Sequence, residues 1–356
     1  MVNLSIEEEA VVAAFVERPG GRLSLPTRGL RADARHSGGD DPLIEIVLVN
    51  NMPDAALRRT ERQFMRLVEA AAGPTAVRVR MCELPGLSRG ETYRNYTRSA
   101  YHDLAAIMRS PIDGLIVTGT EPRAADLADE PYWPAFTRLV DWAAGNTLAT
   151  YWSCLAAHAA VQHLTGIRRR RLPSKLSGVY TCEAVGGHPL TAGMGATFPV
   201  PHSRYNGLDP AAIEAAGYRM LSRSDRVPVD MFLSEGQSLF LFAQGHPEYD
   251  TNSLLKEYRR DARRFLAGER DDMPMLPEGY LSSQAEQAFE EFAHACRSDR
   301  RPETASRLPF LLAESTIVNA WYDPAVALFR NWLDSITERK RATGHATAVA
   351  RAATRS

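Results

Sequence analysis

The sequence contains few cysteines, and no two of them lie close together. Only four occur among 356 residues, at Cys82, Cys154, Cys182 and Cys296, with no CxxC spacing. This pattern argues against a zinc ribbon and against a secreted scaffold held by disulfides. It fits a protein of the reducing cytoplasm that binds no metal.

The sequence also lacks an excess of charge of either sign and any long apolar run. Lys and Arg number 42 and Asp and Glu number 43, so the formal net charge is −1. A nucleic-acid or acidic-membrane partner would favour a basic excess. No stretch reaches the roughly 20 apolar residues of a membrane span, and residues 1–15 lack the features of a signal peptide. We therefore expect an untargeted cytoplasmic protein that acts on small molecules.

Composition divides the chain into four segments. Residues 1–41 end in a polar, glycine-bearing run, and we expect a flexible extension there. Residues 42–275 have the pattern of an α/β domain. Residues 276–339 are helical and charged, then apolar, which predicts a helical extension packed on that domain. Residues 340–356 lack a clear apolar face, so a disordered tail is expected.

Short apolar runs alternate with helical patterns through the main segment. Four of these runs are expected to be strands: residues 44–49, 77–81, 115–117 and 239–243. The run at 44–49 has the β-branched, apolar content of a strand buried on both faces, whereas residues 77–81 alternate apolar residues with arginine. Phe64, Leu67 and Val68 recur at the spacing of one helix face. Strands alternating with helices predict an α/β fold with a doubly wound, mostly parallel sheet flanked by helices.

Polar residues suited to catalysis follow two of the apolar runs. Cys154 precedes an alanine-rich helical pattern, and a helix N-terminus stabilises a thiolate through its dipole and free N–H groups. His246 is the candidate base, and Glu248 can orient its imidazole. Because α/β folds place their sites at the carboxyl ends of strands, we expect a Cys154–His246–Glu248 triad there.

Each of these residues also has a simpler interpretation. A cysteine after an apolar strand is most often a small buried hydrophobe, and a histidine before proline is often only a turn residue. Their joint occurrence at strand ends favours the catalytic pair. His158, one helical turn beyond Cys154, is directed differently from a strand-end residue, so we expect it to pack in the core or behind the catalytic residues rather than to act as the base.

Three long motifs identify a family. They read LPSKLSGVY at 172–180, PHSRY at 201–205 and GHPEYD at 245–250. With NMP at 51–53 and TERQF at 60–64, they resemble the homoserine O-acyltransferases of methionine biosynthesis, a family with a class I glutamine-amidotransferase-like fold. The likeness spans roughly residues 43 to 275, which implies that this segment is an acyltransferase domain.

The resemblance implies a ping-pong transfer of an acyl group from coenzyme A to the hydroxyl of L-homoserine. Cys154 would carry the acyl group as a thioester, with His246 as general base and Glu248 as its partner. The backbone N–H groups of Leu155 and Thr120 are candidates for the oxyanion hole. The acyl-CoA is a cosubstrate, so no permanently bound cofactor is implied. The family also implies a homodimer.

The same resemblance places Lys175, Ser203 and Arg260 among the substrate-contacting residues. Homoserine carries a carboxylate and an ammonium group. Arg260 suits a bidentate contact with the carboxylate, and Lys175 and Ser203 suit further polar contacts. The simpler interpretation of Arg260 is a surface salt bridge.

Donor choice in this family is associated with a position after the Thr118-Gly119 turn, which we assign to Arg123. An arginine can pair with a succinyl carboxylate and a glutamate would repel it, so charge favours succinyl-CoA. The register across Glu121-Pro122 is open by one residue. Acetyl-CoA therefore remains the alternative donor.

Two stretches depart from the pattern of the family. Residues 154–158 read CLAAH, without the tryptophan and glutamine usual after the nucleophile, and Asp54-Ala55-Ala56 replace two lysines. We expect altered packing around the thiol and altered handling of a substrate or coenzyme A. The four arginines at 168–171 could attract coenzyme A phosphates, but a solvated charged face is the preferred interpretation.

Two other classes of protein remain open. A glutamine amidohydrolase shares the Cys…His-x-Glu arrangement, but it flanks its cysteine with glycines where this chain has Trp152 and Ala156. A catalytically inactive binding protein on the same scaffold would be indicated by an unactivated thiol.

Overall fold

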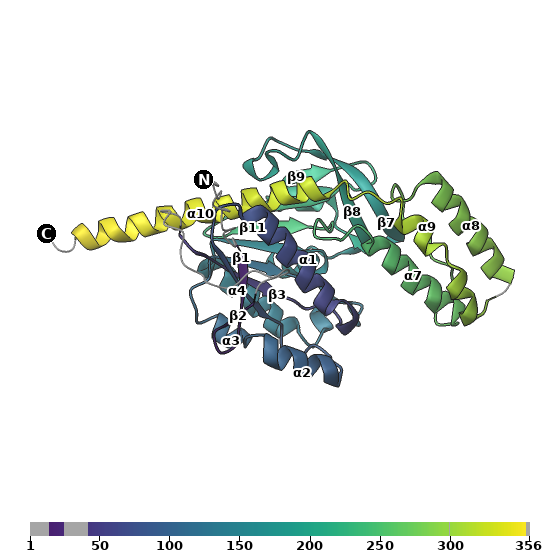
Figure 1. The fold of residues 1–356 in the computed structure, drawn as a ribbon. Helices are drawn as coiled ribbons and strands as arrows, with labels where there is room; N and C mark the ends of the chain where they lie inside the picture. Colours follow the sequence, from purple (N-terminus) through teal and green to yellow (C-terminus); the bar gives the residue numbers. More distant parts are fainter. Residues whose placement is uncertain (1–13, 25–41, 299, 354–356) are drawn as a thin grey trace, which may run out of the picture.

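A central sheet with helices on both faces organises the molecule (Figure 1). The computed structural model describes residues 14–24, 42–298 and 300–353, and those residues form one 11-stranded sheet. Its strands, in order across the sheet, are β2 (Arg22–Ser24), β1 (Ala14–Arg18), β4 (Val77–Cys82), β3 (Ile44–Val49), β5 (Gly114–Val117), β6 (Ala149–Ser153), β11 (Leu239–Ala243), β10 (Met231–Glu235), β9 (Arg219–Arg223), β7 (Arg170–Ala184) and β8 (Thr197–Gly207). The predicted α/β class is confirmed.

The α-helices alternate with strands in the first half of the chain and gather near its end. They are α1 (Asp54–Ala72), α2 (Glu91–Ala100), α3 (Leu104–Ile107), α4 (Trp133–Asn146), α5 (Leu155–Thr165), α6 (Pro210–Ala215), α7 (Ser253–Leu266), α8 (Ser283–Ser298), α9 (Phe310–Glu314) and α10 (Tyr322–Ala353). Within the described ranges, no helix has both the length and the apolar character needed to cross a membrane.

The parallel half of the sheet is the part that the sequence predicts. Strands β1, β4, β3, β5, β6 and β11 run parallel, and all four predicted apolar runs lie in them. Strand β3 shows why both faces are buried, because its side chains alternate between two apolar clusters: Ile46 and Leu48 join one, and Val47 and Val49 join the other. The carboxyl ends of β5, β6 and β11 therefore meet at one edge of the sheet.

The other half of the sheet is antiparallel, which the sequence did not lead us to expect. Strands β10, β9, β7 and β8 continue outward from β11 in antiparallel pairs. The longest pairing joins β7 to β8, and its register shifts between Arg171 and Leu176. Lys175 lies inside that irregularity and Ser203 lies on β8, so the antiparallel half carries two of the predicted substrate-contacting residues.

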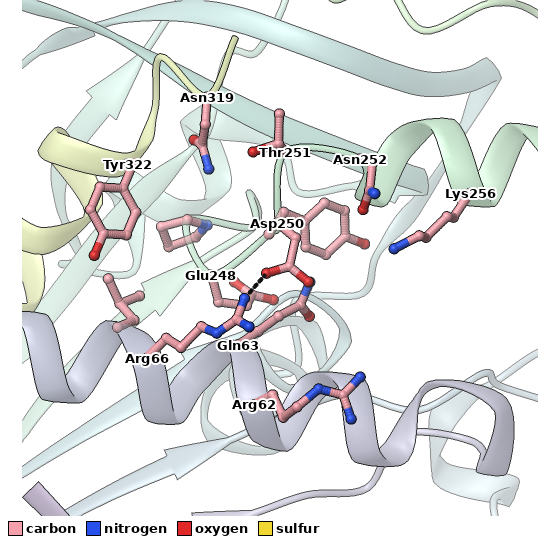
Figure 2. Close-up of a pocket in the computed structure, with 13 residues that line it drawn as sticks. Arg62, Gln63, Arg66, Glu248, Asp250, Thr251, Asn252, Lys256, Asn319 and Tyr322 are labelled. Atoms are coloured by element: carbon pink, nitrogen blue, oxygen red, sulfur yellow. Dashed lines mark hydrogen bonds and ion pairs between the residues drawn. The ribbon is translucent and has the colours of Figure 1, made fainter. Parts of the chain in front are cut away.

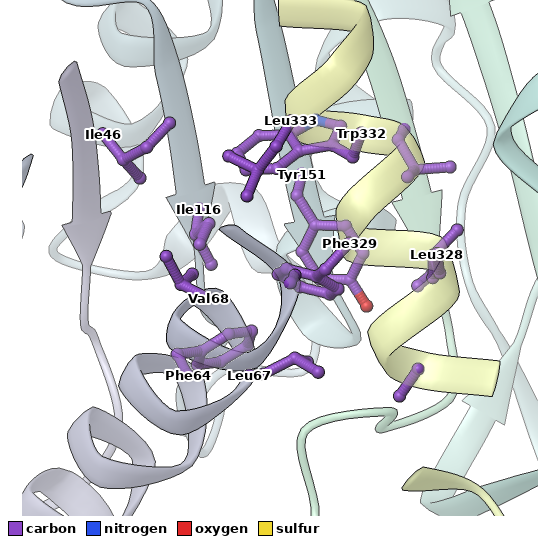
Figure 3. Close-up of a cluster of buried hydrophobic side chains, with 14 of the residues drawn as sticks. Ile46, Phe64, Leu67, Val68, Ile116, Tyr151, Leu328, Phe329, Trp332 and Leu333 are labelled. Atoms are coloured by element: carbon purple, nitrogen blue, oxygen red, sulfur yellow. The ribbon is translucent and has the colours of Figure 1, made fainter. Parts of the chain in front are cut away.

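Helices cover the two faces of the sheet with separate cores. On one face α1 and α10 pack side by side, and Figure 3 shows Phe329 and Trp332 of α10 against Tyr151 of β6 and the apolar side of α1. On the opposite face α4 and α5 pack on β5 and β6. A third cluster joins α7, α8 and α9 at one end of the sheet (Figure 1). Residues 276–339 therefore contribute to two places, α8 and α9 to the third cluster and α10 to the main sheet.

Two expectations about the chain ends need correction. Residues 14–24 were expected to be part of a flexible extension, but they form β1 and β2. Strand β1 pairs in parallel with β4, and its Ala14 and Val16 are buried in the core. Residues 340–353, expected to be a disordered tail, continue helix α10. Lys340 anchors that helix through Asp113 and the carbonyl oxygen of Leu43. The remaining parts of both predicted segments, 1–13, 25–41 and 354–356, lie outside the described residues.

Candidate active site

Cys154 occupies a sharp turn between β6 and α5. Its backbone has φ 50° and ψ −108°, and it is the one non-glycine residue with positive φ in the described part of the chain. Such a conformation is unfavourable for a residue with a Cβ and is characteristic of functional sites. Its backbone N–H donates to the Ala243 carbonyl at 2.7 Å, which joins this turn to the end of β11. The strand–turn–helix geometry places the half-buried thiol at the carboxyl edge of the sheet.

His246 and Glu248 follow β11 and lie beside this turn. Nδ1 of His246 is 2.9 Å from Oε1 of Glu248, and both side chains are almost completely buried. The backbone N–H of His246 donates to the Pro201 carbonyl of β8 at 2.8 Å, which fixes the turn against the antiparallel half of the sheet. The second oxygen of Glu248, Oε2, is buried without a hydrogen-bond partner among the described residues.

The charge state of His246 follows from its neighbours. Burial lowers the pKa of this imidazole, but the Glu248 carboxylate and the Cys154 sulfur, each also hydrogen-bonded to the ring, raise that pKa well above 6.5. An imidazolium in contact with sulfur stabilises the thiolate, which is the nucleophilic form of cysteine. The three residues predicted as a triad are therefore brought together.

Tyr249 connects the imidazole to a second cluster. Its ring stacks on that of His246 with centroids 4.3 Å apart and an interplanar angle of 16°. Its hydroxyl donates to Oε1 of Glu257 at 2.7 Å. Burial raises the pKa of Tyr249 well above 10, and the nearby carboxylates raise it further, so this hydroxyl remains a donor.

The predicted substrate-contacting residues meet around two acidic side chains of α7. Nζ of Lys175 lies 3.3 Å from Glu257 and 3.3 Å from Asp261, and the hydroxyl of Ser203 donates to Glu257. Arg260 binds Asp261 at 2.9 Å with its side chain about half exposed. The cluster thus combines cations, a hydroxyl and carboxylates next to the base.

Glu257 is ionised in this cluster. Burial raises the pKa of its carboxyl group, but Lys175, the hydrogen bonds from Ser203 and Tyr249, and His246 together lower that pKa below 4.5. The pKa of Asp261 is also lowered, because Arg260 and Lys175 outweigh the effect of its burial. The cluster therefore places two ionised carboxylates beside the cationic side chains of Lys175 and Arg260.

The predicted oxyanion donors lie next to the nucleophile turn. Leu155 begins α5, so its N–H has no acceptor inside the helix. Thr120 and Leu155 line one small cavity together with Gly119. A Cβ on Gly119 would lie 2.5 Å from Cβ of Leu155, so only glycine permits the loop to approach the start of α5 so closely. This arrangement places both backbone segments at the thiol side of the site.

Arg123 lines an adjoining pocket of about 230 Å³ together with Thr120 and Glu121. Its backbone N–H donates to Glu130 at 2.5 Å, and its exposed guanidinium makes no ion pair within the described ranges. Burial lowers the pKa of Arg260, but Asp261, then Glu257 and, most weakly, Glu121 raise it, so Glu121 of this pocket lies within electrostatic reach of Arg260. The lining of this pocket also includes Arg89 and Glu130, so it carries two arginines and two glutamates.

His158 packs in the core, as expected. Its Nε2 lies 2.7 Å from Oε1 of Gln244, and burial lowers the pKa of the ring to about 3. Of the arginine run, Arg168 pairs with Asp126 and Arg170 with Asp209, both with exposed guanidinium groups. These contacts fit the solvated face that we preferred.

One buried group of side chains has the ligand types of a metal site. Cys182, His202 and Asp230 offer three ligand atoms within 4.8 Å of one another. However, Nε2 of His202 lies 3.2 Å from Oδ1 of Asp230, and burial lowers the pKa of the imidazole to about 4. These two atoms form a close contact beneath the turn that carries Gly245, and neither has a hydrogen-bond partner among the described residues.

Sequence reasoning missed Tyr249, Glu257 and Asp261. Tyr249 was quoted only as part of a motif, although it directly follows the predicted partner of the base. Glu257, Arg260 and Asp261 have the i, i+3, i+4 spacing of one helix face, which could have linked the acids to Arg260. Residues 256–264 read KEYRRDARR, and such a density of charge is also typical of a helix face exposed to solvent.

Sequence comparison relates this chain to a family of acyltransferases. The family described as homoserine O-succinyltransferase matches residues 32–342. A homoserine O-succinyltransferase of Methylorubrum extorquens is 47% identical over 296 residues, covering 83% of this chain and 88% of that protein. One of Rhodopseudomonas palustris is 48% identical over 294 residues, with the same coverage. One of Bradyrhizobium japonicum is 45% identical over 309 residues, covering 85% of this chain and 94% of that protein.

Solved structures give only distant similarity. A glutamine amidotransferase from Thermotoga maritima superposes with a TM-score of 0.46 at 13% identity, covering 83% of this chain and 98% of that chain. That similarity is too low to inform either function or fold.

The α/β fold, the nucleophile turn and the sequence relatives define the class of protein: this chain is an acyltransferase. More narrowly, it belongs to the homoserine O-succinyltransferase family.

Proposed function

We propose that the chain transfers a succinyl group from succinyl-CoA to the hydroxyl of L-homoserine through a thioester on Cys154, as a step of methionine biosynthesis. The observation that carries the proposal is the contact of Cys154 with His246, whose imidazole is held cationic by Glu248. The names of the relatives supply the substrate class.

In the first half-reaction the Cys154 thiolate attacks the thioester carbonyl of the donor. The tetrahedral oxyanion accepts hydrogen bonds from the N–H groups of Leu155 and Thr120. Collapse of this intermediate breaks the bond to the coenzyme A sulfur, and the His246 imidazolium supplies the proton for that leaving group. The products are free coenzyme A, an acyl-enzyme and a neutral imidazole.

In the second half-reaction neutral His246 acts as general base. It removes the proton from the homoserine hydroxyl, whose oxygen attacks the acyl-enzyme carbonyl. The Cys154 thiolate leaves and the imidazolium is restored, so the cycle closes without any further reactant.

Homoserine recognition falls to the cluster on β7, β8 and α7. Arg260 is half exposed and can offer its guanidinium fork to the carboxylate. Glu257 is an ionised carboxylate near the base and is suited to the ammonium group. Lys175 and Ser203 hold Glu257 in place and add polar contacts.

The donor assignment rests on Arg123, whose guanidinium can pair with the distal carboxylate of a succinyl group. Acetyl-CoA is the alternative donor, and the observation in its favour is that the acidic Glu121 lines the same pocket. In either case the acyl-CoA is a cosubstrate and not a resident cofactor. We also propose that the protein is cytoplasmic and forms a homodimer. Light scattering measures its molar mass in solution and so tests the homodimer directly.

Mass spectrometry of the intact protein tests the mechanism and the donor together. Brief mixing with succinyl-CoA alone is expected to add one succinyl group at Cys154, and homoserine is then expected to remove it. A preferential acetyl adduct in a parallel reaction would show that acetyl-CoA is the donor. Cys154→Ala is the control, and an adduct on that variant, or none on the wild type from either donor, would refute the thioester mechanism.

A further inference from the structure

A second pocket adjoins the catalytic turn and has no part in the proposed chemistry. It measures about 450 Å³, and its lining includes Glu248 but not Cys154, His246 or any of the predicted substrate-contacting residues. Figure 2 shows α1 as one wall, the turn that follows Glu248 as the floor, and the segment carrying Asn319 and Tyr322 opposite α1.

The pocket has an excess of positive charge. Arg66 binds Asp250 at 3.2 Å, but the side chains of Arg62 and Lys256 form no ion pair within the described ranges. Figure 2 shows that Arg62 comes from α1 and Lys256 from α7. Burial, the neighbouring Arg59 and, more weakly, Arg62 lower the pKa of Lys256, while Asp250 and Glu314 offset part of the repulsion among these cations. An anionic ligand would relieve it.

Two residues that line the pocket, Glu248 and Asn319, each carry a hydrogen-bond acceptor that receives no hydrogen bond from the described residues. These acceptors are Oε2 of Glu248 and Oδ1 of Asn319, and both atoms are buried, with no hydrogen-bond partner in the part of the chain that the structure describes. An acceptor left unpaired in this way is costly, so a ligand that donates a hydrogen bond here is stabilised. A fully deprotonated anion supplies no donor and an inorganic phosphate supplies few, whereas a phosphate ester that also carries hydroxyl groups combines the negative charge with several donors.

We propose that this pocket binds a phosphate-bearing metabolite with hydroxyl donors, and that its binding inhibits acyl transfer. Glu248 provides the coupling, because its Oε1 holds His246 and the residue also lines the pocket, while its Oε2 is buried without a hydrogen-bond partner among the described residues. A ligand hydroxyl that donates to Oε2 withdraws negative charge from the carboxylate and weakens its hold on the imidazolium. The inhibition rests on the proposed function, whereas the binding does not.

Isothermal titration calorimetry of the full chain at low salt tests the binding, with adenosine diphosphate and inorganic pyrophosphate as probes. The wild type is expected to bind adenosine diphosphate more tightly than pyrophosphate. The double variant Arg62→Gln/Lys256→Gln is expected to lose at least about tenfold in affinity for both, because two charge-assisted contacts disappear. The control Arg330→Gln changes an exposed arginine of α10 outside the pocket and is expected to bind as the wild type does.

Three results would overturn the proposal. The first is that the wild type binds neither probe, and the second is that the double variant binds both unchanged. The third is that coenzyme A displaces adenosine diphosphate from the wild type and itself fails to bind the double variant, which would make the pocket part of the donor site.

Acyl-enzyme formation separates this proposal from the proposed function. With adenosine diphosphate present, the wild type is expected to form the adduct more slowly, and the double variant is expected to be unaffected and to match the wild type without ligand. Equal slowing of both proteins would refute the coupling through this pocket. A further outcome is that the wild type binds adenosine diphosphate through Arg62 and Lys256 and yet forms no acyl adduct. That result would support the binding site and reject the proposed reaction.

Discussion

At the scale of single residues, Glu257 connects substrate recognition to the catalytic base. It accepts hydrogen bonds from Ser203 and Tyr249 and pairs with Lys175, while the ring of Tyr249 stacks on His246. A carboxylate with three such partners keeps its charge and its position. Loss of that charge is therefore expected to affect binding of a cationic group more than the chemical step.

Glu257→Gln is expected to raise KM for homoserine about 10- to 100-fold, because a charge-assisted contact is worth roughly 1.5–3 kcal/mol. The value of kcat is expected to change less. Steady-state kinetics with homoserine varied at saturating donor measures both quantities. Glu269→Gln, an exposed acid just after α7, is the control. An unchanged KM in the Glu257 variant would remove this residue from substrate binding.

The two histidines near Cys154 are expected to differ sharply in importance. His246→Gln is expected to lose roughly 10²- to 10⁴-fold in kcat, since it removes the proposed general base. His158→Gln preserves a side chain that can reach Gln244 and is expected to retain most of its activity. Rates of acyl-enzyme formation and turnover for both variants decide this. Comparable losses in the two variants would mean that His158 takes part in the chemistry.

At the scale of elements, the site depends on the approach of the loop after β5 to the start of α5. A Cβ on Gly119 would lie 2.5 Å from Cβ of Leu155, and the nearby backbone could only move apart. Gly119→Ala is expected to reduce kcat by about 100-fold through displacement of the oxyanion donors. Gly145→Ala in α4, where the nearest atom is 4.0 Å away, is the matched control. Wild-type kinetics for Gly119→Ala would remove this loop from the catalytic geometry.

Helix α10 is an integral part of the fold, although it belongs to the end of the chain. Phe329 is 1% exposed and packs against Phe64 of α1 and Tyr151 of β6. Phe329→Ala is expected to lower the free energy of unfolding by about 3–5 kcal/mol, as is typical of large core truncations. Urea denaturation measures the change. Arg330→Ala, one position further on the exposed side, is expected to change stability by less than about 0.5 kcal/mol.

The sequence predicted those elements whose signal is local. The parallel strands are short runs with almost every side chain buried, so composition alone identifies them. Strand β7 mixes exposed and half-buried residues over 15 positions, and its pairing with β8 depends on distant partners, which no local pattern encodes. Strand β1 has only five residues, and its place in the sheet depends on pairing with β4, which is distant in sequence.

The same distinction applies to the site. Cys154, His246 and Glu248 follow or lie near strand ends and match a family motif, so their proximity was predictable. The contacts of Glu257 with Lys175 and Ser203 join residues 82 and 54 positions apart. The charges of α7 have no local pattern that distinguishes these contacts from a solvated surface, because Lys175 of β7 and Ser203 of β8 are distant in sequence.

At the scale of the whole molecule, two fully buried histidines set the response of stability to acid. Burial lowers the pKa of His158 to about 3 and that of His202 to about 4, whereas each ring has a pKa near 6.5 in the unfolded chain. Between about pH 6.5 and 4 the unfolded chain therefore binds more protons than the folded one. Stability accordingly falls as the pH is lowered through this window.

The expected fall is up to about 1.4 kcal/mol per pH unit for each histidine, added to any contribution from carboxylates. Urea denaturation between pH 7 and pH 4.5 measures it. His158→Gln removes one of the two titrating rings and is expected to give a shallower fall, while His294→Gln, at an exposed position of α8, keeps the wild-type slope. Equal slopes for the His158 variant and the wild type would contradict this prediction, because they would mean that His158 binds a proton equally well in the folded and the unfolded chain. Its burial beside Gln244 argues against that.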